Sequence, residues 1–249
     1  MKYNVVVFDL DNTLAESKQA LTPEMATLLS SLIAKTKVAI TSGGKFAQLE
    51  GQVVNQLPPE THLENFYLLP TSGAALFEYK NAWTPVYQEL LTNEEVDIVK
   101  KALFEGAQKT GLIDFDAPSY GERIENRGSQ VSLSVLGQEA PPDEKRKWDP
   151  ERVKRPLLQE AIAPLLPDFD VKVGGLTTID VTKHGINKAY GIRKLSAHLG
   201  IPPEEMLYIG DELRPGGNDE VVKETSIQTR AVLNPSQTAN VIEELLGEL

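Results

Sequence analysis

The first third of the chain alternates short apolar runs with segments of helical periodicity. Residues 5–8 are a continuous run of β-branched and aromatic side chains, which is typical of a strand buried in a parallel sheet. Thr22 and Pro23 favour a helix start, and the apolar residues after them have helical spacing up to Leu32. Further strands are predicted at 37–40, 67–69 and 74–77, with a helix over 46–53. This βαβ rhythm predicts a parallel sheet with helices on its faces.

The middle of the chain follows a different pattern. Polar and apolar residues alternate over 130–135, which indicates an antiparallel sheet with one solvated face. We expect residues 137–150, which are rich in proline and charge, to form a loop. One helix is predicted from Asn93 to about residue 108, another up to about Leu166, and further strands at 123–127, 171–173 and 177–180. These elements predict an α+β module inserted into the α/β domain.

The βαβ rhythm returns after residue 184. Helices are predicted over 187–198 and 238–246, and strands over 206–209 and 227–233. The predicted fold class is therefore α/β, with a doubly wound, mostly parallel, Rossmann-like core sheet and an inserted α+β cap domain. The core comprises residues 1–82 and 184–249, and the cap comprises residues 83–183.

The composition of the chain argues against several classes of binding partner and site. The net charge of −11 argues against a nucleic acid held through its phosphates. The chain has no cysteine, which excludes disulfide and thiolate chemistry and agrees with a cytoplasmic location. No stretch approaches the ~20 apolar residues of a membrane span, and Asp9 and Asp11 interrupt the only candidate for a signal peptide. The three histidines lie at unrelated positions, so we expect no zinc site.

Two carboxylates, Asp9 and Asp11, end the first strand. Residues two apart in an extended chain point the same way, and two like charges held that close repel each other. A hard divalent cation with oxygen ligands, most simply Mg²⁺, would remove this cost. The alternative is a solvated turn in which Asn12 adopts a left-handed conformation.

Other polar residues directly follow strands or open a helix. We expect them to lie at the same edge of the sheet as Asp9 and Asp11. They are Thr41, Ser42, Lys188 and Asp211. Ligands of doubly wound sheets bind at this edge, beyond the carboxyl ends of the strands. Phosphoryl transfer needs a nucleophile, charge neutralisation and a proton donor. Asp9 is predicted as the nucleophile, and Asp11 as the acid that protonates the leaving oxygen.

The remaining roles follow from the same reaction. Mg²⁺ would be held by Asp9, the backbone carbonyl of Asp11, and Asp211. Lys188 would neutralise the transferring phosphoryl group. Ser42, or alternatively Thr41, would hydrogen-bond it with the amides of Gly43 and Gly44, and Thr13 would order the loop. Asp219 is either a metal ligand, a neighbour of the metal site, or the cap of a following helix.

These motifs, in this order, resemble the haloacid dehalogenase superfamily with a type IIB cap. More narrowly, the chain is similar to the eukaryotic-type phosphomannomutases almost from end to end. The likeness is carried by four segments: Asp9-x-Asp-x-Thr13, Glu125-Asn-Arg127-Gly, Gly174 to Val181, and Gly210-Asp211 with Arg214 to Asp219.

The resemblance implies that the cap binds the second, non-reacting phosphate of a phosphorylated sugar and that the caps pair in a homodimer. It assigns Arg127, Thr178 and Asp180 to substrate binding, with Lys18 as a further basic position and Lys145 or Arg146 as the last. Four positions depart from the pattern: Tyr120 and Gln138 stand where those mutases have arginine, Thr178 stands where they have serine, and Asn12 replaces a glycine.

Three functions remain open. The first is a Mg²⁺-dependent phosphohexose mutase, and the second is a sugar-phosphate phosphatase with the same core chemistry. Because Tyr and Gln carry no charge, the loss of two arginines would weaken the hold on a second phosphate and let water accept the phosphoryl group. The third is a non-catalytic binding protein. For single residues, Arg127 could instead form a surface salt bridge with Glu122 or Glu125, and Lys18 could lie on solvated surface.

Overall fold

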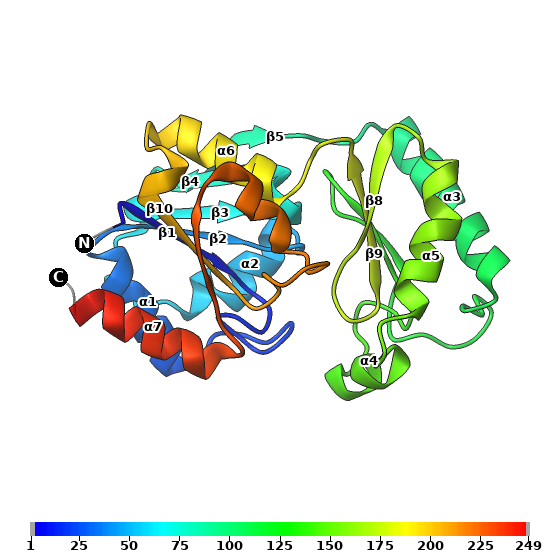
Figure 1. The fold of residues 1–249 in the computed structure, drawn as a ribbon, viewed down its shortest axis with the longest axis horizontal. Coiled ribbons are helices and arrows are strands. Elements are labelled where there is room, and N and C mark those ends of the chain that lie inside the picture. Colours follow the sequence, from blue (N-terminus) through cyan, green and yellow to red (C-terminus); the bar gives the residue numbers. More distant parts are fainter. Residues whose placement is uncertain (1–2, 248–249) are drawn as a thin grey trace. The chain divides into compact units, whose positions relative to one another are not determined.

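The computed structural model describes residues 3–247 and divides into two compact units (Figure 1). The core unit comprises Met1–Gln88 and Asn187–Leu249, and the inserted unit comprises Glu89–Ile186. Residues 83–88, which the sequence pattern assigns to the inserted module, instead form strand β5 (Trp83–Gln88). Because β5 pairs with β4 (Ala75–Tyr79), it extends the core sheet.

Within the described residues, the core sheet has seven strands in the order β11-β10-β1-β2-β3-β4-β5. The first five are parallel, and β4 and β5 are antiparallel to their neighbours. This arrangement confirms the predicted mostly parallel sheet. The bounds of the parallel strands are β1 Val5–Asp9, β2 Lys37–Thr41, β3 Phe66–Leu69, β10 Met206–Gly210 and β11 Gln228–Ala231.

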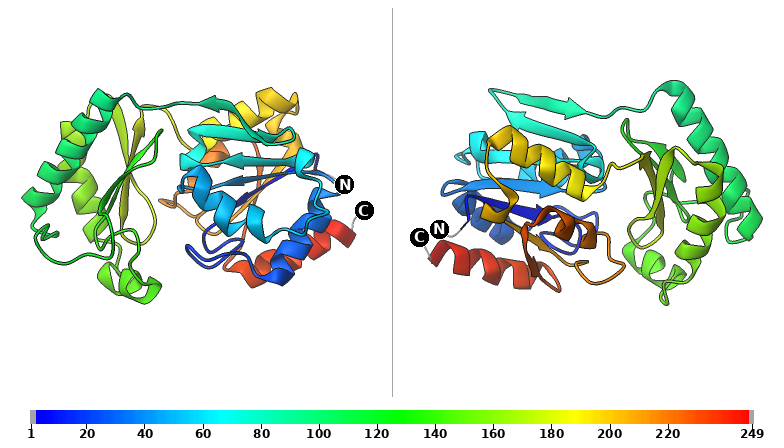
Figure 2. Two further views of the ribbon diagram at one scale, coloured as in Figure 1. Left: turned by 180° about the vertical axis from the view of Figure 1, so that it is seen from behind. Right: turned by 45° about the horizontal axis from the view of Figure 1, so that its top comes forward.

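Helices cover both faces of this sheet, as Figures 1 and 2 show. On one side, Val6 and Phe8 of β1 belong to a core with the apolar faces of α1 (Pro23–Ile33), α2 (Phe46–Gln52) and α7 (Pro235–Gly247). On the other side, Val5 and Val7 belong to a core with α6 (Lys188–Leu199). Successive residues of β1 thus point into opposite layers, which explains why the whole strand is apolar.

The inserted unit is an antiparallel sheet with helices packed on it. The strand order is β6-β7-β9-β8, with bounds β6 Ile124–Asn126, β7 Val131–Ser134, β8 Phe169–Val173 and β9 Thr178–Lys183. Helices α3 (Asn93–Thr110) and α5 (Lys154–Ile162) share a core with the apolar side chains of β7 and β9. The predicted antiparallel α+β architecture is therefore present.

Two details of this unit correct the sequence-based expectations. The polar face of β7 is not solvated, because Ser132 and Ser134 are fully buried and donate to Asp180 Oδ1 and the Gly137 carbonyl. The predicted loop contains a helix, α4 (Pro142–Trp148). Proline opens this helix, acidic residues occupy its first turn and basic residues its last, which favours a helix without apolar periodicity.

Over residues 3–247, no helix is both long and apolar enough to cross a membrane.

Candidate active site

The two carboxylates at the end of β1 lie in different surroundings. Asp9 is buried with 6% exposure, whereas the Asp11 carboxylate accepts the backbone N–H of Lys18 at 2.6 Å in the turn that follows. Asn12 has the predicted left-handed conformation, with φ of 61°. The turn is therefore present, but the burial of Asp9 rules out the alternative of a merely solvated strand end.

The partner of Asp9 is Lys188, the first residue of α6. Asn187 caps this helix by accepting the backbone N–H of Tyr190. Lys188 Nζ donates to Asp9 Oδ1 at 2.6 Å and to Asp219 Oδ1 at 2.5 Å, and all three side chains are buried. A lysine is rarely buried without carboxylate partners, so this ion-paired arrangement marks a specialised site.

Asp211 and Asp219 come from the end of β10 and the loop after it. Asp211 Oδ1 accepts a long hydrogen bond of 3.4 Å from Thr13 Oγ1. Asp219 is fully buried and receives three protein donors: Lys188 Nζ and Tyr208 Oη on Oδ1, and the Glu212 amide on Oδ2. A Cβ at Gly210 would lie 2.4 Å from Asp219 Oδ2, so glycine is required there.

Oxygen atoms of Asp9, Asp211 and Asp219 lie within 4.8 Å of one another. Lys188 supplies one positive charge to these three carboxylates, which leaves two negative charges unbalanced when all are ionised. A donor set made only of carboxylate oxygens with this residual charge fits a hard divalent cation. The Asp11 carboxylate is not part of this group.

Burial controls the protonation of the cluster. The pKa of Asp9 is raised well above its usual value, chiefly by burial; Lys188 opposes this effect, and Asp219 and Asp211 add to it. The pKa of Asp211 is raised to about 6 by burial and by the neighbouring Asp219 and Glu212. Burial alone would lower the pKa of Lys188, but the charges of Asp219 and Asp9 outweigh it, and the pKa is raised. Lys188 therefore remains an ammonium ion.

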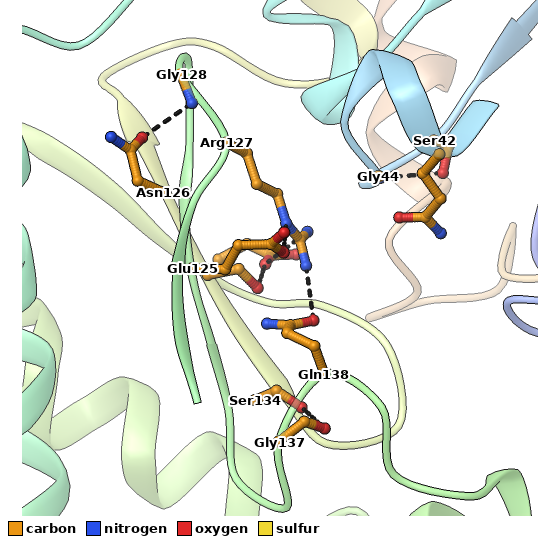
Figure 3. A network of polar contacts seen from close by, with 12 residues as sticks. Ser42, Gly44, Glu125, Asn126, Arg127, Gly128, Ser134, Gly137 and Gln138 are labelled. Carbon is orange, nitrogen blue, oxygen red and sulfur yellow. Dashed lines mark hydrogen bonds and ion pairs between the residues drawn. The ribbon is translucent and has the colours of Figure 1, made fainter. Parts of the chain in front are cut away.

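The loop after β2 reaches the same edge of the sheet. Thr41 pairs in register with Asp9, and Ser42 follows directly. Ser42 is buried, and its hydroxyl accepts the Gly44 amide at 3.1 Å (Figure 3). The Gly44 amide predicted to bind phosphate is thus engaged within the loop. Thr41 Oγ1 is buried without a hydrogen-bond partner, which makes it a second hydroxyl available to a ligand.

In the inserted unit, Arg127 follows β6 directly and is the centre of a polar network (Figure 3). Its guanidinium donates to Glu125 Oε2 at 2.8 Å and to Gln138 Oε1 at 3.0 Å, and it lies 3.9 Å from Asp180 Oδ1. The salt bridge with Glu125, considered as an alternative, is therefore present, but the Arg127 side chain is 6% exposed, so the pair does not lie on the surface. The structure thus brings together Arg127 and Asp180, both predicted to bind substrate.

The other residues predicted to bind substrate are Thr178, Lys145 or Arg146, and Lys18. Thr178 Oγ1 and Asp180 Oδ2 crowd the position that a Cβ on Gly174 would occupy, so they lie side by side at the start of β9. Lys145 is buried and its Nζ donates to the Gln138 carbonyl, whereas Arg146 is half exposed and pairs with Asp143. Lys145 therefore lies nearer the Arg127 network than Arg146 does. Lys18 has a positive φ of 59° in the turn that holds Asp11.

Sequence reasoning missed one member of these networks. Tyr208 was identified only as part of an apolar strand. A tyrosine within an apolar run gives no sign that its hydroxyl binds an acid in a later loop.

Comparison with known proteins gives the family that this chain resembles. A family model described as haloacid dehalogenase-like hydrolase matches residues 6–214. The phosphomannomutase of Encephalitozoon cuniculi is 25% identical, over 98% of this chain and 94% of that protein. Phosphomannomutase 2 of Dictyostelium discoideum is also 25% identical, over 98% of this chain and 96% of its own length.

Solved structures show the same fold. IMP-bound IMP-nucleotidase of Plasmodium falciparum has a TM-score of 0.69 with 17% identity, covering 99% of this chain and 68% of that one. The C-terminal domain of C. albicans trehalose-6-phosphate phosphatase has a TM-score of 0.62 with 17% identity, covering 100% and 94%. Since the family model spans most of the chain and the fold agrees, this protein belongs to the haloacid dehalogenase-like hydrolases and is a phosphotransferase enzyme of that superfamily.

Proposed function

We propose that the enzyme transfers a phosphoryl group from a phosphorylated hexose to Asp9, in a Mg²⁺-dependent reaction of the phosphomannomutase type. The observation that carries this proposal is the buried contact of Lys188 with Asp9, beside the carboxylates of Asp211 and Asp219. The near full-length similarity to phosphomannomutases, which includes the inserted unit, supports the hexose substrate.

In the first half-reaction, a carboxylate oxygen of Asp9 attacks phosphorus and the ester bond to the sugar oxygen breaks. Asp11 gives its proton to the departing alkoxide, so the sugar leaves as an alcohol. Lys188 neutralises charge on the phosphoryl oxygens, while the Ser42 and Thr41 hydroxyls bind them. The product on the protein is an aspartyl phosphate at Asp9.

The second half-reaction reverses these roles. A sugar hydroxyl, or water, attacks the phosphorus of the aspartyl phosphate while Asp11 accepts its proton. The bond to the Asp9 oxygen breaks and the free carboxylate is restored. Transfer to a sugar phosphate makes the enzyme a mutase, and transfer to water makes it a phosphatase.

Mg²⁺ fits the acidic cluster, with Asp9, Asp211 and the Asp11 carbonyl as its proposed ligands. When bound, it would neutralise the carboxylates and the charge that develops on the phosphoryl group. The three protein donors on Asp219 favour a different role for that residue, which is to hold Lys188.

One observation favours a sugar-phosphate phosphatase as the second candidate. The Arg127 guanidinium is already bound by Glu125 and Gln138 and lies near Asp180, so its charge is largely compensated within the inserted unit. A compensated arginine attracts a second phosphate less strongly, and a bisphosphate held less firmly leaves before the second transfer.

A single assay separates these functions. The protein is incubated with Mg²⁺, mannose 1-phosphate and a trace of hexose bisphosphate. Mannose 6-phosphate as the product supports the mutase, and inorganic phosphate supports the phosphatase. If neither forms and no sugar phosphate is turned over with Mg²⁺, the proposal fails and a non-catalytic binding protein remains.

The nucleophile is tested by Asp9→Asn. We expect turnover to fall to background, because an amide oxygen cannot form the aspartyl phosphate, while the thermal unfolding midpoint stays close to that of the wild type. Asp97→Asn, at an exposed position of α3, is the matched control and should keep full activity. Activity retained by Asp9→Asn would remove Asp9 as the nucleophile.

Two expectations stay predictions. They are a homodimer formed through the inserted unit, which the resemblance implies, and a cytoplasmic location, with which the absence of cysteine agrees.

A further inference from the structure

We propose that Tyr208 is a positioning residue of this site, whose hydroxyl holds the Asp219 carboxylate and, through it, the Lys188 ammonium against Asp9. The expected effect of Tyr208 on catalysis rests on the proposed function. Its effect on the positions of Asp219 and Lys188 rests on the contacts alone.

Strand register places Tyr208 beneath the reacting carboxylate. Tyr208 on β10 pairs with Val7 on β1, two residues before Asp9, so the Tyr208 and Asp9 side chains lie on the same face of the sheet. Tyr208 is fully buried, and its ring packs in the apolar layer that contains Val7 and Leu195 of α6. Its hydroxyl reaches past this layer into the charged cluster.

The Tyr208 hydroxyl contacts both Asp219 and Lys188, which also contact each other. Tyr208 Oη donates to Asp219 Oδ1 at 2.6 Å, and Lys188 Nζ, which also binds Asp219 Oδ1, lies 3.4 Å from Tyr208 Oη. The ammonium has three N–H groups, and Asp9, Asp219 and Tyr208 provide an acceptor for each. The position of Nζ is therefore defined from three sides.

Packing alone does not require this hydroxyl. Phenylalanine would fill the apolar layer equally well, and a buried hydroxyl is unfavourable unless it forms a hydrogen bond. Burial raises the pKa of the Tyr208 hydroxyl well above its usual value, and the charge of Asp219 adds to this. Tyr208 is thus a proton donor to Asp219 throughout the neutral range, and its short contact with a carboxylate is of the stronger, charge-assisted kind.

Without the hydroxyl, Asp219 keeps only Lys188 and the Glu212 amide, and one ammonium N–H loses its acceptor. The carboxylate is then held less firmly on its Oδ1 side, and Nζ can move away from Asp9. Substrate binding elsewhere in the site is unaffected. Tyr208 should therefore contribute to the rate of phosphoryl transfer and not to the affinity for substrate.

The test compares Tyr208→Phe with Tyr67→Phe, a matched control on β3 whose tyrosine is buried in the same apolar layer. For Tyr208→Phe we expect kcat to fall about tenfold or more, with KM within about twofold of the wild type. Tyr67→Phe should leave both constants unchanged, and both variants should unfold near the wild-type temperature. In crystals of Tyr208→Phe, the distance between Lys188 Nζ and Asp9 Oδ1 should be longer than in wild-type crystals.

An unchanged kcat, an unchanged distance, or an equal loss of kcat in the two variants would overturn the proposal. If the wild-type protein has no phosphotransferase activity, the proposed function fails. The crystallographic distance then still decides whether Tyr208 positions Lys188.

Discussion

At the scale of single residues, the site is dominated by the cost of burying charge. Asp9, Lys188 and Asp219 are each at most 6% exposed. The two carboxylates are compensated by the Lys188 ammonium, which pairs with both of them. Asp211 accepts a hydrogen bond from Thr13, but burial and its acidic neighbours Asp219 and Glu212 disfavour its charged form. Its ionisation therefore strains the metal-free protein.

This strain predicts a pH-dependent effect of Asp211→Asn. The pKa of Asp211 is raised from 3.8 to about 6 in the folded state, so the folded state binds the proton more tightly than the unfolded state. Ionisation of Asp211 then reduces the free energy of unfolding as the pH rises from 3.8 to about 6. With a metal chelator present, Asp211→Asn should be more stable than the wild type by up to about 2 kcal/mol at about pH 8, and equal to it at about pH 4.

Urea unfolding at the two pH values measures this difference, with the exposed Asp97→Asn as the control. Addition of Mg²⁺ should stabilise the wild type more than Asp211→Asn, because the variant has lost a proposed ligand. A variant that is less stable than the wild type at both pH values, without metal, would show that ionised Asp211 is not strained.

At the scale of elements, the position of α6 determines where Lys188 lies. A Cβ on Gly191, one turn into this helix, would lie 2.8 Å from Gly73 Cα and 2.9 Å from Leu69 Cδ2. Gly73 itself has a φ of 84°, in the region that favours glycine. Two glycines in contact thus allow α6 to approach the segment between β3 and β4 closely.

This close approach predicts the effect of Gly191→Ala. The added methyl group must push α6 outward, which costs about 1–3 kcal/mol of stability and moves Lys188 relative to Asp9. We expect a lower unfolding temperature together with at least about a tenfold loss of kcat, measured on the same preparation. Gly51→Ala in α2 is the control, because a Cβ there meets no atom within 4 Å.

The control should gain stability, since alanine favours a helix interior by about 0.5–1 kcal/mol over glycine. Full activity and stability in Gly191→Ala would mean that α6 is not held by this contact.

At the scale of the whole molecule, each unit has its own apolar core. One buried cluster is built only from residues of the inserted unit, among them Val99, Leu133 and Ile179, and two others only from the core unit. An apolar core that is complete within one continuous segment is the condition for independent folding.

We therefore predict that the isolated segment Glu89–Ile186 folds by itself. Its circular dichroism should show helix and sheet, and its urea unfolding should be a single cooperative transition. The same segment with Leu133→Asp, which places a charge in the centre of its core, should be unfolded. A spectrum typical of random coil for the unmodified segment would contradict the prediction.

Most elements of the core could be predicted because their signals are local. An apolar run such as 5–8 must be a buried strand, and a polar residue directly after it must lie at the carboxyl edge of the sheet. Asp9, Ser42 and Asp211 were found in this way. Strand β5 and helix α4 were missed because neither has a periodic apolar face, and β5 owes its conformation to pairing with β4.

The pattern of residues along the chain was enough to predict the type of fold, the edge of the sheet that carries the chemistry, and the acids and lysine gathered there. It could not predict which groups touch: Lys188 with Asp9 across 179 residues, Tyr208 with Asp219 across 11, and Arg127 with Gln138 and Asp180. The physical reason is that backbone periodicity reports burial, which is a local property. The partner of a buried charge is selected by strand order and helix packing, which join residues that no local pattern connects.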